Sequence, residues 1–174
     1  MQKRFVVGML LVMATLAVAQ DKAPRPSPAA QATCKFSDGH TIKVDYSSPR
    51  AKGRKIFGGL VPYGEVWRTG ANEATSFVTD EALSIGGKDV PAGSYTLFTI
   101  PNANKWTLII NKKTGEWGIP YKYESDDLAR VDMEVSKTAA PVENFTISFH
   151  EMGKGCHMYL DWENTRATIE ITEK

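Results

Sequence analysis

The sequence predicts an all-β protein, folded as a single antiparallel β-sandwich or partly open barrel of about 9–10 short strands. Apolar and polar residues alternate with period two along many short segments, and turn residues separate those segments roughly every ten residues. No segment has a sustained helical period, which disfavours helical classes. No motif repeats at a fixed spacing, which disfavours propellers and solenoids.

The clearest alternation lies near the C-terminus. Phe145, Ile147 and Phe149 share one face of an expected strand, whereas Thr146 and Ser148 lie on the other. The segments in which this kind of pattern predicts a strand are Ala32–Phe36, Thr41–Tyr46, Thr75–Thr79, Ala82–Ile85, Ser94–Ile100, Trp106–Asn111, Leu128–Val135, Asn144–His150, Cys156–Glu163 and Thr165–Thr172.

The first residues have the layout of a secretory signal peptide. Lys3 and Arg4 precede an apolar run that ends in Ala17-Val18-Ala19, which are small residues suited to a cleavage site. The run is shorter than the ~20 apolar residues that a membrane-spanning helix needs. We therefore expect cleavage after Ala19, a secreted or periplasmic location, and no membrane span in the mature chain.

Length and composition predict one domain. A chain of 174 residues has room for a single domain of ordinary size. We expect a signal peptide over 1–19, a flexible Pro/Ala-rich leader over 20–31, and one β domain over 32–174. The formal net charge of +1 argues against general attraction to nucleic acid, and we expect no nucleic-acid partner.

Two cysteines allow only one intramolecular pairing. Cys34 is in phase with Phe36 on the core side of the first expected strand, and Cys156 is in phase with Met158 and Leu160 on a late strand. Because secreted and periplasmic proteins fold in an oxidising environment, the pattern predicts a Cys34–Cys156 disulfide. The alternative is two unpaired buried thiols.

Residues that can ligate metals gather near Cys156, but their spacing disfavours a metal site. His157 follows Cys156 directly on the expected strand, so the two side chains point to opposite faces. A disulfide would also remove the thiolate that a copper site needs. We expect no metal and no cofactor.

The stretch from Ser48 to Asn72 is an irregular connection, in which Tyr63–Arg68 could hold one short helical turn. Long irregular connections are uncommon in compact domains and are often functional. This one is rich in basic and aromatic residues, namely Arg50, Lys52, Arg54, Lys55, Phe57, Tyr63, Trp67 and Arg68. Its first four basic residues fit either an anion contact or a solvated loop.

Arg68 lies between Trp67 and the turn that follows. An arginine in this position can stack on an aromatic ring or pair with a carboxylate such as Glu73. Either contact would shape a ligand pocket or pin the loop to the sheet, and both roles stay open at this point.

Several runs of the chain resemble a known bacterial family. The most specific lies within 48–75 and contains Val66-Trp67-Arg68-Thr69-Gly70-Ala71-Asn72-Glu73; the others are Pro91–Pro101, Trp106–Lys112, Trp117-Gly118, Asp127–Lys137 and Phe145–Phe149. Together they resemble the bacterial domain of unknown function 2911. The resemblance implies a secreted or periplasmic protein and no particular activity.

Three functions fit these residues. The first is a binding module of the cell envelope for a small carboxylated or sugar ligand, with the candidate residues Arg50, Arg54, Tyr63, Trp67, Arg68, Asn72, Glu73 and Trp117. The second is a hydrolase in which Glu73 or Glu65 works with Asp127, and the third is a non-catalytic envelope scaffold. Because the usual motifs of nucleophilic, metallo- and phosphate-binding enzymes are missing, the sequence favours the binding module.

Overall fold

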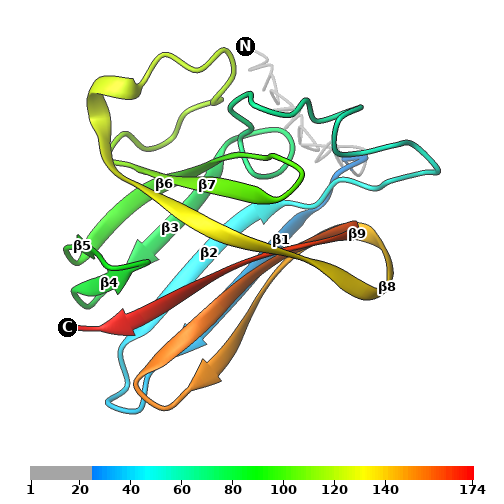
Figure 1. The fold of residues 1–174 in the computed structure, drawn as a ribbon. Helices are drawn as coiled ribbons and strands as arrows, with labels where there is room; N and C mark the ends of the chain where they lie inside the picture. Colours follow the sequence, from blue (N-terminus) through cyan, green and yellow to red (C-terminus); the bar gives the residue numbers. More distant parts are fainter. Residues whose placement is uncertain (1–24) are drawn as a thin grey trace, which may run out of the picture.

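In residues 25–174, one continuous antiparallel sheet of nine strands makes up the fold (Figure 1). This computed structural model describes residues 25–174; the expected signal peptide over 1–19 and residues 20–24 of the expected leader lie outside the described residues. The strands are β1 (Ala29–Lys35), β2 (Thr41–Ser47), β3 (Thr75–Thr79), β4 (Leu83–Ile85), β5 (Lys88–Val90), β6 (Gly93–Ile100), β7 (Lys105–Asn111), β8 (Asp127–Met152) and β9 (Gly155–Glu173). A 3-10 turn at Glu124–Asp126 precedes β8. Within the described chain, no helix is long and apolar enough to cross a membrane.

The strand order along the sheet is β1-β2-β3-β6-β7-β8-β9-β4-β5. β4 and β5 follow β3 in the sequence but lie at the far end of the sheet, where β4 pairs with the end of β9. These two strands form a hairpin through Gly86-Gly87. Both glycines have positive φ, +53° and +78°, as a type I′ turn requires.

β8 and β9 are long and bend round the molecule (Figure 1). The first part of β8 pairs with β7, whereas its last part pairs with β9 and contacts β1. Two main-chain hydrogen bonds join this last part to the segment after β2, from Ala51 N to Glu143 O at 2.8 Å and from Phe145 N to Pro49 O at 2.9 Å. The sheet therefore curls back on itself and encloses its apolar face.

The predicted all-β class and the long irregular connection are confirmed, but the strands near the C-terminus are fewer and longer than expected. Four expected strands form only two, β8 from Leu128–Val135 and Asn144–His150, and β9 from Cys156–Glu163 and Thr165–Thr172. Register shifts within β8 and the positive φ of Glu163, +53°, interrupt the alternation without ending the pairing. β5 was not expected.

β1 begins at Ala29, three residues earlier than predicted, so the end of the expected flexible leader is part of the sheet. Just before it, Pro28 O accepts a hydrogen bond of 2.9 Å from Ser48 N. The added residues, Ala-Ala-Gln, show no apolar alternation. Main-chain pairing does not need such alternation, and for this reason the pattern missed them.

The enclosed face forms one core rich in aromatic residues. Core side chains with almost no exposed surface include Trp106, Trp162, Phe77 and Phe145. Along β2 the burial alternates as the sequence predicts, with Ile42 and Val44 inside and Lys43 exposed.

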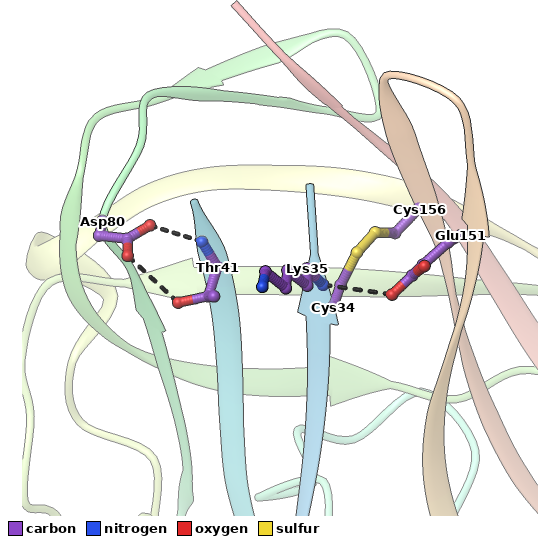
Figure 2. The surroundings of a disulfide bond; sticks show 6 residues. All are labelled: Cys34, Lys35, Thr41, Asp80, Glu151 and Cys156. Carbon is purple, nitrogen blue, oxygen red and sulfur yellow. Dashed lines mark hydrogen bonds between the residues drawn. A yellow bond between two sulfur atoms is a disulfide. The ribbon is translucent and has the colours of Figure 1, made fainter. Parts of the chain in front are cut away.

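The predicted disulfide between Cys34 and Cys156 is confirmed. The two Cα atoms are 6.6 Å apart and both side chains are buried. Figure 2 shows the bond joining β1 to the start of β9, beside a 3.4 Å hydrogen bond from Lys35 N to Glu151 Oε1. The bond therefore ties the first strand to the β8–β9 hairpin at the place where the curled sheet meets itself.

Candidate ligand-binding site

The connection between β2 and β3 has apolar anchors of its own. Ile56, Phe57 and Val61 are buried, and the Phe57 ring packs edge-on against Trp106 of β7 with 4.8 Å between ring centres. Main-chain hydrogen bonds of 2.9 Å run from Gly58 N to Val61 O and from Val61 N to Ile56 O. A connection that buries its own side chains has a fixed shape, so it can position functional groups.

The short helical turn that the sequence allowed at Tyr63–Arg68 does not form. Gly64 has a φ of +76°, which a right-handed helix does not allow, and Trp67 bridges to β6. Trp67 N donates to Thr99 O at 2.7 Å and Trp67 O accepts from Thr99 N at 2.9 Å. The Trp67 ring stacks on Trp162 of β9, with 5.9 Å between ring centres and 18° between planes. This bridge fixes Trp67 at the edge of the core.

The turn after Trp67 holds two residues in the left-handed region, Thr69 with φ +56° and Asn72 with φ +58°. This conformation costs roughly 1–3 kcal/mol and is rare for a β-branched residue such as threonine. Thr69 is fully buried, and its hydroxyl lies 3.1 Å from Thr99 Oγ1. Its carbonyl accepts a 2.7 Å hydrogen bond from Thr75 Oγ1. These buried contacts hold the turn that carries Arg68 and Asn72.

Two contacts hold Arg68. Its Nη1 donates to the main-chain carbonyl of Asn72, and its guanidinium carbon lies 5.2 Å from the centre of the Trp117 ring. Partial burial lowers the pKa of the guanidinium, which stays charged at neutral pH. Within residues 25–174 no ion pair includes Arg68. Of the two contacts open from the sequence, the aromatic stack is present, and Glu73 pairs instead with Arg25 at 2.7 Å.

Gly118 brings the connection between β7 and β8 close to Arg68. Its φ is +94°, and a Cβ atom there would lie 2.9 Å from Ala74 Cβ, 3.0 Å from Phe98 Cε1 and 3.3 Å from Arg68 Cβ. A side chain at this position would push the two connections apart. The glycine therefore allows Trp117 to lie beside Arg68.

Between these two connections lies a cavity of about 470 Å³. Its lining is mostly apolar and contains three tryptophans, with Glu65, Arg68 and Asn72 as the polar side chains. The other lining residues are Pro49, Leu60, Val61, Pro62, Val66, Trp67, Gly70, Ala71, Trp117, Ile119 and Trp162. A concave apolar site of this size with a few polar groups is typical of small-molecule binding. We call it the aromatic cavity.

The aromatic cavity brings together four of the eight residues proposed from the sequence, Trp67, Arg68, Asn72 and Trp117. Tyr63 is not among them, because its ring lies against Gly58, where a Cβ atom would be 2.8 Å from Tyr63 Cε2.

The other three proposed residues, Glu73, Arg50 and Arg54, also lie outside the aromatic cavity. Glu73 lines a separate depression with its partner Arg25. Arg50 and Arg54 line a third depression, together with Lys52.

The three carboxyl groups proposed for a hydrolase lie in different places. Glu65 lines the aromatic cavity, Glu73 lines the depression beside Arg25, and Asp127 lines neither. Asp127 Oδ1 accepts from Tyr121 Oη and, at 2.8 Å, from Asn111 Nδ2.

Arg130 Nε donates to Asp127 Oδ2 at 2.8 Å. The Asp127 carboxylate therefore joins the end of β7 to the start of β8. Among the described residues, the aromatic cavity has one carboxylate in its lining, that of Glu65, rather than a pair.

Several residues that line the aromatic cavity were not proposed from the sequence. Leu60 and Ile119 are exposed apolar residues, and the sequence offered one signal for Ile119, the apolar run Trp117-Gly118-Ile119-Pro120 inside a polar connection. Trp162 is in phase with the buried Cys156 on β9, and it is both buried and part of the lining. No periodicity could show that a core residue forms the floor of a cavity.

These features define the class, a small disulfide-linked all-β protein whose aromatic cavity lies between two irregular connections. A family model described as "Protein of unknown function (DUF2911)" matches residues 27–171. The chain therefore belongs to this family, as its motifs predicted. No curated protein and no solved structure matches the chain.

Proposed function

We propose that this protein is a binding module that takes a small ligand with a flat apolar or sugar-ring face and a carboxylate group. The observation that carries the proposal is the position of Arg68 in the aromatic cavity, stacked on Trp117 and without a carboxylate partner within the described chain. An arginine that is partly buried and unpaired is a ready partner for an anionic ligand.

The chemistry of the lining supports this ligand class. Indole faces bind flat hydrophobic surfaces and the apolar faces of sugar rings. The guanidinium presents several N–H donors in one plane, which suits the two oxygens of a carboxylate. Arg68 Nη1 donates to the Asn72 carbonyl, whereas Arg68 Nε and Nη2 have no acceptor among residues 25–174. These groups would therefore be available to a ligand.

The rigidity of the site supports binding with little rearrangement. Thr69 and Asn72 are kept in the left-handed region, and Gly118 keeps the second connection close. A preorganised site loses less conformational entropy when a ligand binds.

We further propose that the protein works outside the cytoplasm, in the periplasm or as a secreted protein. The buried Cys34–Cys156 disulfide supports this location, because such bonds form and persist in oxidising compartments. The expected cleavage after Ala19 belongs to the same proposal.

The test is a thermal-shift and tryptophan-fluorescence titration with pairs of ligands that differ in charge. Benzoate is compared with benzamide, and glucuronate with glucose, at constant ionic strength. Trp117 is 56% exposed, so its fluorescence can report on a ligand that covers it. We expect saturable stabilisation by the carboxylates and much weaker effects of their neutral counterparts.

Four variants separate the roles of the site residues. We expect Arg68→Gln and Trp117→Ala to weaken carboxylate binding by about tenfold or more, and Arg68→Lys to keep part of it. Tyr63→Ala is the matched control, because it removes an exposed aromatic side chain outside the aromatic cavity. Equal losses in Tyr63→Ala, or no response to any compound, would contradict the proposal and favour a scaffold.

A further inference from the structure

A second concave surface, a depression of about 340 Å³, lies beside Ser27. Among the described residues, those that line it are Pro26, Ser27, Arg50, Lys52 and Arg54, so three of these side chains are cationic and none is acidic. Ser27 O accepts a 3.1 Å hydrogen bond from Asn72 Nδ2, which places the depression next to the aromatic cavity but with a different lining. We call it the basic depression.

Both guanidinium groups of the basic depression are held by the backbone and by Ser48. Arg50 Nη1 donates to the Ser48 carbonyl at 3.0 Å and to the Ser48 hydroxyl at 2.8 Å. Arg54 donates from Nε to the Ala51 carbonyl at 3.0 Å and from Nη2 to the Arg50 carbonyl at 2.7 Å.

These bonds orient two normally flexible side chains and leave some of their donors unused. Among residues 25–174, Nε and Nη2 of Arg50, Nη1 of Arg54 and Nζ of Lys52 have no acceptor. The donors of three cations are therefore collected around one depression, and the two guanidinium groups are already oriented.

No carboxylate neutralises this group of charges within the described chain, since none of the three cations takes part in an ion pair. Two acids do contact the same loop, but through its backbone. Glu143 Oε1 accepts from Lys52 N at 2.8 Å, and Glu163 Oε2 accepts from Ile56 N at 3.1 Å. These two carboxylates fix the backbone of the loop and do not pair with its cationic side chains. The cationic side chains therefore still repel one another, and a bound anion would relieve this repulsion.

We propose that Arg50, Lys52 and Arg54 bind a phosphate group, carried by a soluble phosphomonoester or by a lipid headgroup. A phosphate group offers several oxygens and carries up to two negative charges, which suits two guanidinium forks and an ammonium better than a single carboxylate does. This site is separate from the aromatic cavity and does not depend on the function proposed for it.

The experiment compares two sources of the same phosphate chemistry. Glycerol phosphate is titrated against glycerol with sodium chloride at equal ionic strength, and the thermal midpoint is recorded. In parallel, the protein is sedimented with phosphatidylcholine vesicles that contain or lack phosphatidylglycerol. Each measurement uses the wild type, Arg50→Gln/Arg54→Gln, and the control Lys88→Gln/Lys122→Gln, which removes the same charge at two exposed positions outside the basic depression.

We expect wild type and control to bind, and Arg50→Gln/Arg54→Gln to bind at least about tenfold more weakly. Saturable binding of glycerol phosphate assigns a soluble ligand, and binding only to phosphatidylglycerol vesicles assigns a lipid headgroup. If the double variant fails to fold, Lys52→Gln replaces it, because Lys52 Nζ makes no hydrogen bond within the described chain; it should weaken binding about threefold or more. Failure to bind either phosphate source, or an equal loss in the control, overturns the proposal.

Discussion

The guanidinium carbon of Arg68 lies 5.2 Å from the centre of the Trp117 ring. The two residues belong to different connections, Arg68 to that between β2 and β3 and Trp117 to that between β7 and β8. A cation above an exposed aromatic ring contributes only about 0.5–1 kcal/mol, so this stack does not hold the connections together by itself. The close packing of Gly118 against Ala74 and Phe98 does more to fix their separation.

The first prediction concerns Gly118. We expect Gly118→Ala to destabilise the protein by about 2–4 kcal/mol, because the new methyl group adds steric overlap to the cost of a φ of +94°. Gly115→Ala is the matched control, since Gly115 has a φ of +75° and open space around it, and it should cost only about 1 kcal/mol. Denaturant unfolding measures both values, and equal values would contradict the packing argument.

A second prediction distinguishes a structural Asp127 from a catalytic one. Asp127→Asn replaces an acceptor oxygen with an amide, so the donors of Asn111, Tyr121 and Arg130 can no longer all be satisfied. We expect a loss of roughly 1–3 kcal/mol in the free energy of unfolding. Asp126→Asn is the control, because the Asp126 side chain makes no hydrogen bond within residues 25–174. If Asp127→Asn lost no more free energy of unfolding than Asp126→Asn, a structural role of Asp127 would be contradicted.

The third prediction concerns the disulfide. Cys34 and Cys156 are separated by 122 positions, and a loop of that size contributes on the order of 5 kcal/mol in the chain-entropy model. We expect Cys34→Ala/Cys156→Ala to lose a large part of this stability, measured by urea unfolding without reductant. Reductant should then destabilise the wild type and leave the variant unchanged. Two reactive thiols in the denatured, unreduced wild type would refute the bond.

Some parts of the fold could be predicted because they depend on local alternation. Phe145 and Ile147 alternate with polar neighbours, and the phase of Cys34 and Cys156 on such strands was enough to predict their bond. The continuity of β8 and β9 could not be predicted. A bend such as that at Glu163 breaks the alternation as a loop does, although the backbone pairing continues.

The site could be predicted less completely, because a cavity depends on which distant segments meet. Arg68 and Trp117 were proposed from residue type, but their contact depends on a close approach that Gly118 permits. A pair with Glu73 was one of the two contacts that the sequence left open for Arg68. No pattern in the sequence showed the positive φ of Asn72, which lies between these two residues. The partner that Glu73 has, Arg25, lies in a segment expected to be flexible.

The last prediction is a pH dependence at His40. Its Nδ1 lies 2.6 Å from Asp38 Oδ2, and this hydrogen bond is the main cause that raises the pKa of His40 above 6.5, with Glu81 and Asp80 adding to it. A raised pKa in the folded state means that protonation stabilises the fold. This stabilisation is fully present below the unfolded value of about 6.5 and is lost as the pH rises through the folded value.

An NMR titration of His40 should therefore give a pKa above 6.5 in the wild type and a lower one in Asp38→Asn. The free energy of unfolding supplies the second measurement. The difference between wild type and His40→Gln should be larger at about pH 5.5 than at about pH 8.5, because only the wild type gains from the charged imidazole. A difference that does not change with pH would contradict the coupling of His40 to Asp38.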